Sequence, residues 1–244
     1  MADSFIPTID ASKLKPSNKY VCWIDTMGTQ NIMSESLAKA SNYILKLHSC
    51  LFQAASELEA IMIYPVMDGA YITCANKKVL TVVLKKAFSS LANIFLQEKD
   101  NGKRFVVRAS LAFGDIIDGN MITEDVTEHI PTDYKQNILL GMPIVQAYKS
   151  EKNAPPFGIF IHESARKFDD EHKIQGRTFK WWNQKFSQEL CGAICEYFEW
   201  CRYNSLLLEM DEKKIDNYIK LAKSYFIPYS IETKDKQTAD SLLI

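Results

Sequence analysis

The segment from Tyr20 to Gln30 constrains the fold of this chain more than any other. It reads Tyr-Val-Cys-Trp-Ile-Asp-Thr-Met-Gly-Thr-Gln, so an apolar run ends at Asp25, a short loop containing Gly28 follows, and a helical pattern begins. This order predicts a strand, a loop and a helix, with a carboxylate beside the helix N-terminus. Such a site suits a metal ion that carries a phosphate, because the carboxylate holds the cation and backbone N–H groups receive the anion. An Asp after a strand is also a common turn residue or helix cap.

Apolar periodicity along the chain predicts a ferredoxin-like arrangement of the α+β class. The predicted order is strand, helix, strand, strand, helix, strand, with further strands and one helix after it. A turn is expected at Gly114–Asp115, with the strand after it pairing back on the strand before it. The predicted strands are 20–24, 60–66, 70–75, 104–113, 116–122 and 157–161, and the predicted helices are 34–58, 79–97 and 143–152.

A second carboxylate, Asp68, lies in a predicted hairpin. Asp-Gly between two apolar runs is a strong hairpin signal and places residues 67–69 in the turn. We expect the first strand to lie beside the strand that precedes this hairpin, so that Asp25 and Asp68 meet at one edge. With the main-chain carbonyl of Thr26 they offer the hard oxygen ligands that Mg²⁺ or Mn²⁺ prefers. Two such ions can activate an attacking oxygen and stabilise a leaving pyrophosphate. Turn geometry alone also explains an Asp here.

The bulk composition excludes several classes of protein. The chain has 29 basic and 30 acidic residues and a formal net charge of −1, so no overall field favours nucleic acid or a membrane surface. The apolar runs are far shorter than a membrane span, and the N-terminus lacks the regions of a signal peptide. Six cysteines without a secretory context predict reduced thiols. We therefore expect a cytoplasmic protein.

The C-terminal part of the chain differs in character from the rest. Aromatic residues crowd the stretch 181–203, and the pattern from Asp211 to Phe226 predicts an amphipathic helix capped by Asp211. We expect Trp181 and Trp182 to lie in a core or a subunit interface rather than to stack on a nucleobase. The predicted organisation is a lead-in at 1–17, a main domain at 18–177 and a helical extension at 178–244.

Residues 18–167 resemble the catalytic domain of class III nucleotide cyclases, because they contain partial matches to its motifs in the expected order. In that family a strand-end Asp opens an Asp-x-x-Gly-Phe-Thr loop, which Asp25-Thr-Met-Gly28-Thr-Gln matches in part. A second metal Asp precedes a small residue and a Tyr, as in Asp68-Gly-Ala-Tyr71. The remaining matches are Val107-Arg108-Ala-Ser-Leu-Ala-Phe-Gly114-Asp-Ile116, Gly141-Met-Pro-Ile-Val145-Gln-Ala147-Tyr-Lys149 and Gly158-Ile-Phe-Ile-His-Glu-Ser-Ala-Arg166.

Departures from the family pattern narrow the expected substrate. The transition-state Asn of the family falls at Val145, and its transition-state Arg falls at Lys149, which keeps the charge but loses bidentate geometry. The Lys and the acid that read a purine in the family are missing from residues 61–64 and 137–140, and a bulky Tyr64 narrows the expected base pocket. The combination is most similar to the pyrimidine cyclases of bacterial Pycsar anti-phage systems.

The resemblance implies a uridylate cyclase that converts UTP to 3′,5′-cyclic UMP and pyrophosphate by two-metal catalysis. It also implies a head-to-tail homodimer with shared active sites, in which Arg108 and Lys149 could serve the partner's site, and a separate effector protein that senses the product. In the implied site, Asp25, Asp68 and Thr26 bind Mn²⁺ or Mg²⁺. The triphosphate is bound by the backbone of Thr26, Met27, Gly28 and Thr29. Arg108 contacts the phosphates, Lys149 balances charge, and Tyr64 forms a wall of the base pocket.

Other functions stay open at this stage. The residues do not show which pyrimidine is used, so a cytidylate cyclase is an alternative. A catalytically weak cyclase-homology domain that binds nucleotide and regulates a partner would also show Val145 and Lys149, although it has little need for two metal carboxylates. An adenylate or guanylate cyclase requires the purine-reading pair that is missing. A polymerase palm requires a basic channel that the charge balance does not suggest.

Overall fold

The computed structural model describes residues 9–123, 126–127, 130–168, 177–204 and 211–226. In these residues seven strands form one sheet with the order β2-β3-β1-β4-β6-β7, and β5 pairs with β4 beside this path. The strands are β1 (Ser17–Thr26), β2 (Met62–Val66), β3 (Gly69–Cys74), β4 (Val107–Asp118), β5 (Leu139–Leu140), β6 (Ile159–Ile161) and β7 (Thr178–Phe179).

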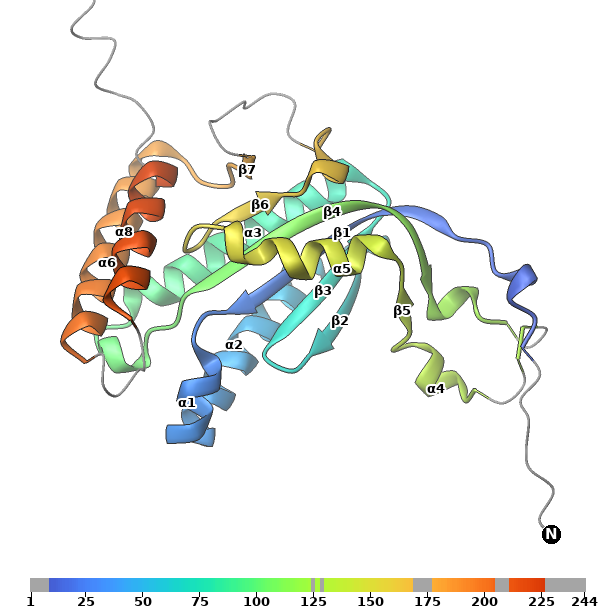
Figure 1. Cartoon of the computed structure of the whole chain (residues 1–244), viewed down its shortest axis with the longest axis horizontal. Coiled ribbons are helices and arrows are strands. Elements are labelled where there is room, and N and C mark those ends of the chain that lie inside the picture. The colour runs from blue at the N-terminus through green and yellow to red at the C-terminus, as the bar shows by residue number, and fades with distance from the viewer. Residues whose placement is uncertain (1–8, 124–125, 128–129, 169–176, 205–210, 227–244) are drawn as a thin grey trace, which may run out of the picture.

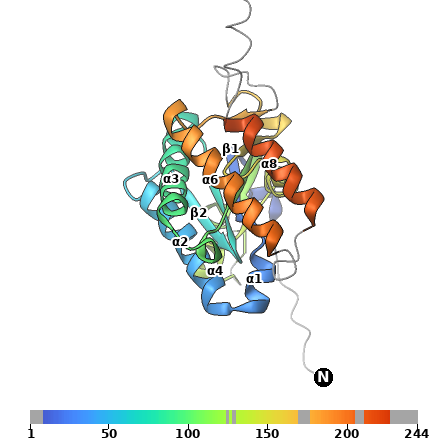
Figure 2. The same ribbon diagram turned by 90° about the vertical axis from the view of Figure 1, so that its left-hand side faces the viewer.

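Helices cover both faces of this sheet (Figure 1). Helices α2 and α3 pack together over one face, and α5 lies across β1 and β4 on the other. Helices α6 and α8 lie side by side at one end of the molecule, where α6 contacts α3 (Figure 2). The helices are α1 (Thr29–Glu35), α2 (Leu37–Ala55), α3 (Lys77–Gln97), α4 (Thr132–Lys135), α5 (Met142–Ser150), α6 (Gln184–Tyr203) and α8 (Glu212–Phe226).

The predicted α+β, ferredoxin-like fold is confirmed, with one correction to the strand order. Strand β1 lies between β3 and β4 and is antiparallel to both. The expected neighbour of β1 was β2, the strand before the hairpin, and that prediction is wrong. Helix α2 leads the chain to the outer position of the sheet, where β2 forms. The hairpin then returns the chain, and β3 takes the position beside β1. Asp25 still faces the hairpin, because it pairs with Gly69.

The predicted turn at Gly114–Asp115 is also wrong. Strand β4 runs through both residues without interruption, because β1 pairs with it from Ser17 opposite Ile116 to Thr26 opposite Val107. Gly114 adopts a positive φ of 152°, a backbone conformation that its missing Cβ permits. The local turn signal of a Gly-Asp pair was therefore overridden by a long antiparallel partner.

The predicted helix over residues 34–58 corresponds to α2 and the last two residues of α1, so a break at Ser36 and most of α1 were not predicted. Helix α1 ends at Glu35, and the Ser36 N–H donates to the Ile32 carbonyl at 2.8 Å. Ser36 has an extended backbone, and its side-chain oxygen accepts from the Lys39 N–H at 3.3 Å, so it caps α2. A serine with a free side-chain acceptor favours such a cap over a position inside a helix.

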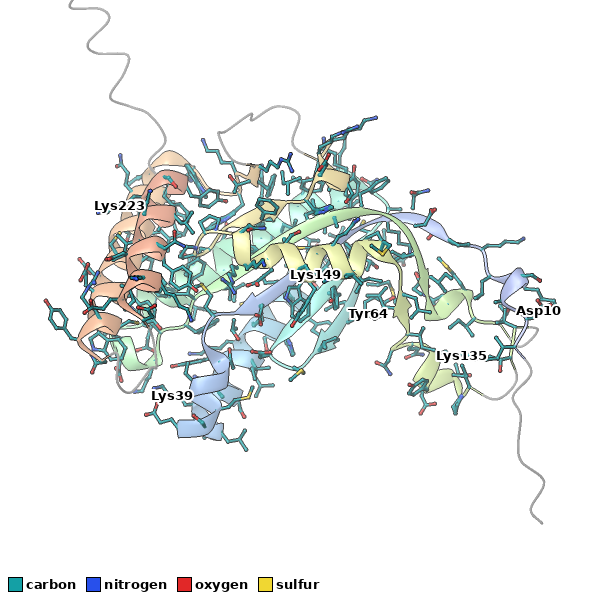
Figure 3. All side chains as sticks on the ribbon, viewed as in Figure 1. Asp10, Lys39, Tyr64, Lys135, Lys149 and Lys223 are labelled. Carbon is teal, nitrogen blue, oxygen red and sulfur yellow. The ribbon has the colours of Figure 1, made fainter. Side chains whose placement is uncertain are left out.

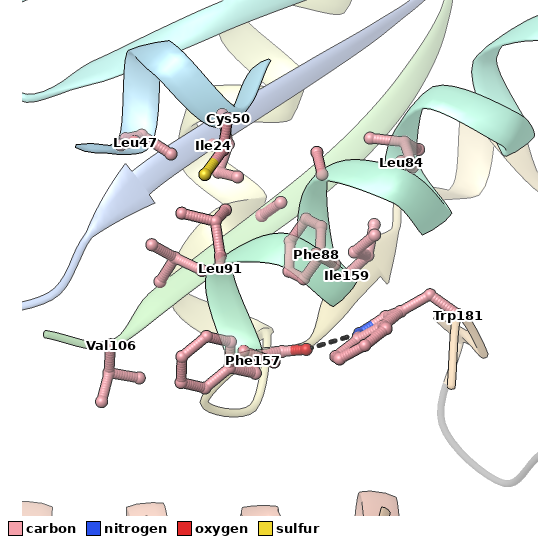
Figure 4. Close-up of a cluster of buried hydrophobic side chains, with 14 of the residues drawn as sticks. Ile24, Leu47, Cys50, Leu84, Phe88, Leu91, Val106, Phe157, Ile159 and Trp181 are labelled. Atoms are coloured by element: carbon pink, nitrogen blue, oxygen red, sulfur yellow. Dashed lines mark hydrogen bonds between the residues drawn. The ribbon is translucent and has the colours of Figure 1, made fainter. Parts of the chain in front are cut away.

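Most of the buried apolar side chains form one cluster between the sheet and α2, α3 and α6 (Figure 4). Alternation along β1 directs Cys22 and Ile24 into this cluster and Val21 and Trp23 into a smaller one under α5. Trp181 joins the large cluster, and its Nε1–H donates to the Phe157 carbonyl at 2.8 Å. The core role predicted for Trp181 and Trp182 is confirmed, since both side chains are buried.

Helix α3 is the one helix in the described part of the chain that is long and apolar enough to cross a membrane. Its buried side chains, which include Leu80, Leu84 and Phe88, all belong to the large core cluster. A core helix of a globular protein meets the same criteria of length and composition. The packing of α3 is that of such a core helix.

Candidate active site

The β2–β3 hairpin brings Asp68 to the end of β1. The two turn residues are Met67 and Asp68, whereas Gly69 is already the first residue of β3 and pairs with Val66 and Asp25. The prediction that Gly69 belongs to the turn is therefore wrong. A glycine is needed at 69 for a different reason: a Cβ there would lie 2.5 Å from the Ile24 carbonyl oxygen and 2.6 Å from the Trp23 ring.

Asp25 lies near the end of β1 with its carboxylate largely withdrawn from water. Its Oδ1 atom is buried and has no hydrogen-bond partner among the described residues. Burial, followed by the negative charge of Asp68, raises the pKa of Asp25 to about 7, against a smaller opposite effect of Arg108. The structure thus brings together the two carboxylates that the sequence predicts to meet.

The main chain of the hairpin is held from two sides. The Thr26 hydroxyl donates to the Asp68 carbonyl at 3.3 Å, and Nε2 of His48, on α2, lies 3.0 Å from the Gly69 carbonyl oxygen. The Thr29 hydroxyl donates to the Thr26 carbonyl at 3.0 Å and also contacts the Thr26 hydroxyl. These bonds join strand, hairpin and both helices around the carboxylate pair.

The Asp25–Asp68 pair fits a divalent cation. An unpaired, buried carboxylate oxygen beside a second carboxylate is an arrangement that a cation stabilises, both by neutralising the repulsion and by supplying the missing partner. The Thr26 carbonyl has a second lone pair available besides the one used by Thr29. Within the described residues, no group of three or more His, Cys, Asp or Glu side chains forms a metal site. The candidate ligands are therefore two carboxylates and a main-chain oxygen.

The loop after β1 has the form that the sequence predicts. Gly28 is the N-cap of α1 with φ 77° and ψ 14°, a left-handed conformation that suits glycine. No atom lies within 4 Å of the position that a Cβ on Gly28 would take. The Met27 N–H donates back to the Val106 carbonyl at 2.8 Å, so this donor is already used in the structure.

Arg108 lies directly opposite Asp25 in the pairing of β1 with β4. Paired residues in antiparallel strands direct their side chains to the same face. The Arg108 Nε–H nevertheless donates to Glu151, in the 3₁₀ turn that follows α5, and this ion pair is mostly buried. Arg108 therefore adjoins Asp25 of its own chain, and its expected role in a partner's site stays a prediction.

The structure does not bring Lys149 or Val145 to the carboxylate pair of the same chain. Both side chains are exposed on α5, where Figure 3 labels Lys149. Tyr64 lies on β2, on the α5 side of the sheet, where it pairs with Tyr71. Only 6% of Tyr64 is exposed, and within the described part of the chain its buried hydroxyl has no hydrogen-bond partner.

Two residues of this site, Glu151 and His48, were not predicted from the sequence. Glu151 lies 43 positions from its partner Arg108, and His48 lies 21 positions from Gly69. Each is a single polar residue in or next to a helical pattern, which usually indicates a solvated helix face. One signal was available for Glu151, since it follows the helix that contains Val145 and Lys149.

The fold of this chain is similar to that of class III nucleotide cyclase catalytic domains. No protein-family model matches the sequence, and no curated protein sequence does. The similarity therefore appears in three dimensions.

Solved structures with a similar fold include adenylyl and guanylyl cyclases. The guanylyl cyclase Cya2 matches with a TM-score of 0.51 and 14% identity, over 67% of this chain and 84% of the other. A bacterial light-regulated adenylyl cyclase matches with a TM-score of 0.51 and 12% identity, over 68% of this chain. This chain spans 49% of the length of that cyclase. At such identities the matches establish the fold, and activity is a separate question.

Proposed function

We propose that this protein is a nucleotide cyclase that converts UTP to 3′,5′-cyclic UMP and pyrophosphate with two divalent cations. The observation that carries the proposal is the Asp25–Asp68 pair, in which two carboxylates repel each other and one buries an unpaired oxygen. The cyclase-like fold supports the same class of reaction. Cyclic UMP would then be a second messenger for a separate effector protein in anti-phage defence.

In the proposed reaction the ribose 3′-oxygen attacks the α-phosphorus and pyrophosphate leaves, so the protein mainly positions groups and balances charge. Bound Mn²⁺ or Mg²⁺ would supply activation of the attacking oxygen and stabilisation of the leaving pyrophosphate. Asp25, Asp68 and the Thr26 carbonyl would hold the cations. Backbone N–H groups of the loop 26–29, other than that of Met27, which donates to Val106, would receive the triphosphate, and Arg108 would contact its β- and γ-phosphates.

The preference for a pyrimidine rests on the side chains that β2 directs toward the α5 side of the sheet. They include Met62 and Tyr64, which pair with Thr73 and Tyr71. Neither carries a charge that could read a purine edge, and the phenol of Tyr64 occupies space that a larger base would need. The choice of UTP over CTP rests on the family resemblance alone, so a cytidylate cyclase is the nearest alternative.

We also propose that the active protein is a homodimer with its sites at the interface. Apolar side chains are exposed on the α5 side of the sheet, where Asp25 and Arg108 also lie. Apart from a ring contact between Tyr148 and Trp23, the exposed apolar side chains of α5 remain uncovered within the described residues, and a second copy would cover them. In such a dimer Lys149 would serve the site of the other protomer. The exposed apolar side chains are Val66, Leu140, Met142, Val145 and Tyr148.

The decisive experiment is an incubation of the purified protein with each of the four ribonucleoside triphosphates and Mn²⁺, followed by chromatography. We expect a cyclic monophosphate from UTP, and no product from the Asp68→Asn variant. Product from CTP alone would change the base but keep the class of reaction. Cyclic AMP or cyclic GMP would overturn the role given to Tyr64, and unchanged turnover by Asp68→Asn would overturn the metal site.

One observation favours a second candidate, a regulatory domain that binds nucleotide without turning it over. The position of the family's transition-state Asn is Val145, whose exposed side chain cannot hydrogen-bond. A confirmed dimer that binds UTP in the presence of Mn²⁺ but yields no cyclic product would support this candidate.

A further inference from the structure

Arg108 and Asp25 are placed to form an ion pair but do not form one. They lie directly opposite each other in neighbouring antiparallel strands, where side chains of opposite charge usually pair. Among the described residues, the ion-pair partner of Arg108 is Glu151, and Oδ1 of Asp25 is left without any partner. The arrangement therefore needs a reason, since an unpaired buried carboxylate oxygen is costly.

We propose that Glu151 is a positioning residue that holds the Arg108 guanidinium away from Asp25. This keeps the Asp25 carboxylate available for a divalent cation, and it leaves the Nη groups of Arg108 available for a triphosphate. The inference rests on the proposed metal site and adds a residue to it that acts only through Arg108.

The environment of Glu151 suits this role. Its side chain is 9% exposed and that of Arg108 is 18% exposed, so water screens their attraction only weakly. Glu151 binds Nε, which leaves the four N–H donors on Nη1 and Nη2. Glu151 also lies in the turn that directly follows α5, and Ser110 of β4 donates to the Ala147 carbonyl of α5, so the position of Glu151 relative to β4 is fixed.

Removal of Glu151 would let the local charges rearrange. Arg108 would lose its partner while remaining largely buried, and the nearest carboxylate across the strand pair is Asp25. An Arg108–Asp25 pair would compete directly with a cation for the same oxygens. A purely structural ion pair between Glu151 and Arg108 predicts something different, namely a loss of stability without a change in Mn²⁺ affinity that depends on Arg108.

A double-mutant cycle on Mn²⁺ affinity separates these cases, with free Mn²⁺ measured by electron paramagnetic resonance. We expect Glu151→Gln to weaken Mn²⁺ binding by about tenfold or more, in the range typical of residues that orient metal ligands. In the Arg108→Met background the same substitution should have no further effect, because the competing guanidinium is gone. Equal weakening in both backgrounds, or none in either, would overturn the proposal.

Two further variants complete the design. Asp216→Asn removes a carboxylate partner of another arginine, Arg202, on the C-terminal helices, and should leave Mn²⁺ affinity unchanged. If Glu151→Gln does not fold, Glu151→Asp keeps the charge with a shorter reach. It should weaken Mn²⁺ binding by less, again only when Arg108 is present.

Turnover of the wild type distinguishes this inference from the proposed function. Coupling between Glu151 and Arg108 in a wild type that makes no cyclic nucleotide would support the inference and reject the cyclase. Cyclic product from a wild type without that coupling would do the reverse. A wild type that binds no Mn²⁺ would overturn both.

Discussion

Asp25, a ligand of the proposed metal site, has a side chain that costs stability in the free protein. A carboxylate with a buried, unpaired oxygen beside a second carboxylate disfavours its own ionisation, which is why its pKa is raised to about 7. Natural proteins accept such a cost at functional sites and offset it elsewhere. The offset here is the large core cluster beneath the sheet.

The first prediction concerns stability in EDTA. The pKa of Asp25 is higher in the folded state than its ordinary value of 3.8, so the stability associated with its protonated form is present at low pH and is lost as pH rises toward 7. Asp25→Asn should therefore stabilise the metal-free protein at pH 8 by up to about 4 kcal/mol, and by much less at pH 4.5. Urea denaturation at both pH values measures this, and a variant less stable than the wild type at pH 8 would contradict it.

The second prediction concerns two glycines. Gly69→Ala places a methyl group against the Ile24 carbonyl and the Trp23 ring and should destabilise the protein by about 2 kcal/mol or more. Gly192→Ala is the matched control, because nothing lies within 4 Å of that Cβ on helix α6, and it should stabilise by up to about 1 kcal/mol. Chemical denaturation compares the two, and equal effects would show that Gly69 is not a contact point.

At the scale of secondary-structure elements, the hairpin that carries Asp68 is held by hydrogen bonds from other elements more than by its own turn. The hairpin turn contains Met67 with φ 53°, a strained value for a residue with a Cβ. Its main chain is fixed by Thr26 from β1 and His48 from α2 rather than by an ideal turn sequence. The position of Asp68 therefore depends on three elements at once.

The third prediction tests this dependence. His48→Ala should remove the bond to the Gly69 carbonyl, destabilise the hairpin by about 1 kcal/mol and increase amide exchange in residues 66–70. His48→Gln should recover part of the protection. His162→Ala is a suitable control, because His162 bonds to Ser164 and not to the hairpin. Unchanged exchange in the His48 variant would show that α2 does not hold the turn.

At the scale of the whole molecule, the C-terminal helices are part of the main core. Trp181, Phe198 and Phe226 are buried in the same cluster as the sheet residues, and Trp181 is hydrogen-bonded to Phe157. The fourth prediction is that the chain ended at residue 177 does not fold cooperatively, because it would expose the surfaces of α3 and β6 that these residues cover. Thermal unfolding followed by near-ultraviolet circular dichroism measures this. A cooperative transition in the shortened chain would contradict it.

The fifth prediction concerns assembly. Asp68→Asn and Lys149→Ala should each inactivate the protein, but mixed dimers of the two should contain one intact site if Lys149 serves the partner. At equal amounts the mixture should recover about a quarter of wild-type turnover, given random exchange within a two-fold dimer. Light scattering establishes the dimer first. No recovery from a verified mixed dimer would place Lys149 outside the partner's site.

Local pattern predicted the helices and strands well, because apolar periodicity depends on residues a few positions apart. It predicted β1, the β2–β3 hairpin, α3 and the helix ending at Phe226, and it predicted that Asp25 and Asp68 meet. It failed at Gly114–Asp115 and at Ser36, where a long strand partner and a side-chain cap decided the outcome. The first outcome depends on tertiary strand pairing and the second on a single hydrogen bond, and apolar periodicity carries no information about either.

The sequence by itself determined the α+β class, the pair of carboxylates at one sheet edge and the glycine of the β1–α1 loop, since each follows from local chemistry. Only the tertiary structure decided that β3 lies beside β1, that His48 holds the hairpin, and that Arg108 binds Glu151 instead of Asp25. Such choices depend on which of several compatible partners is nearest after folding. Contacts between residues tens of positions apart are set by packing of the whole sheet, and so they cannot be read from any one segment.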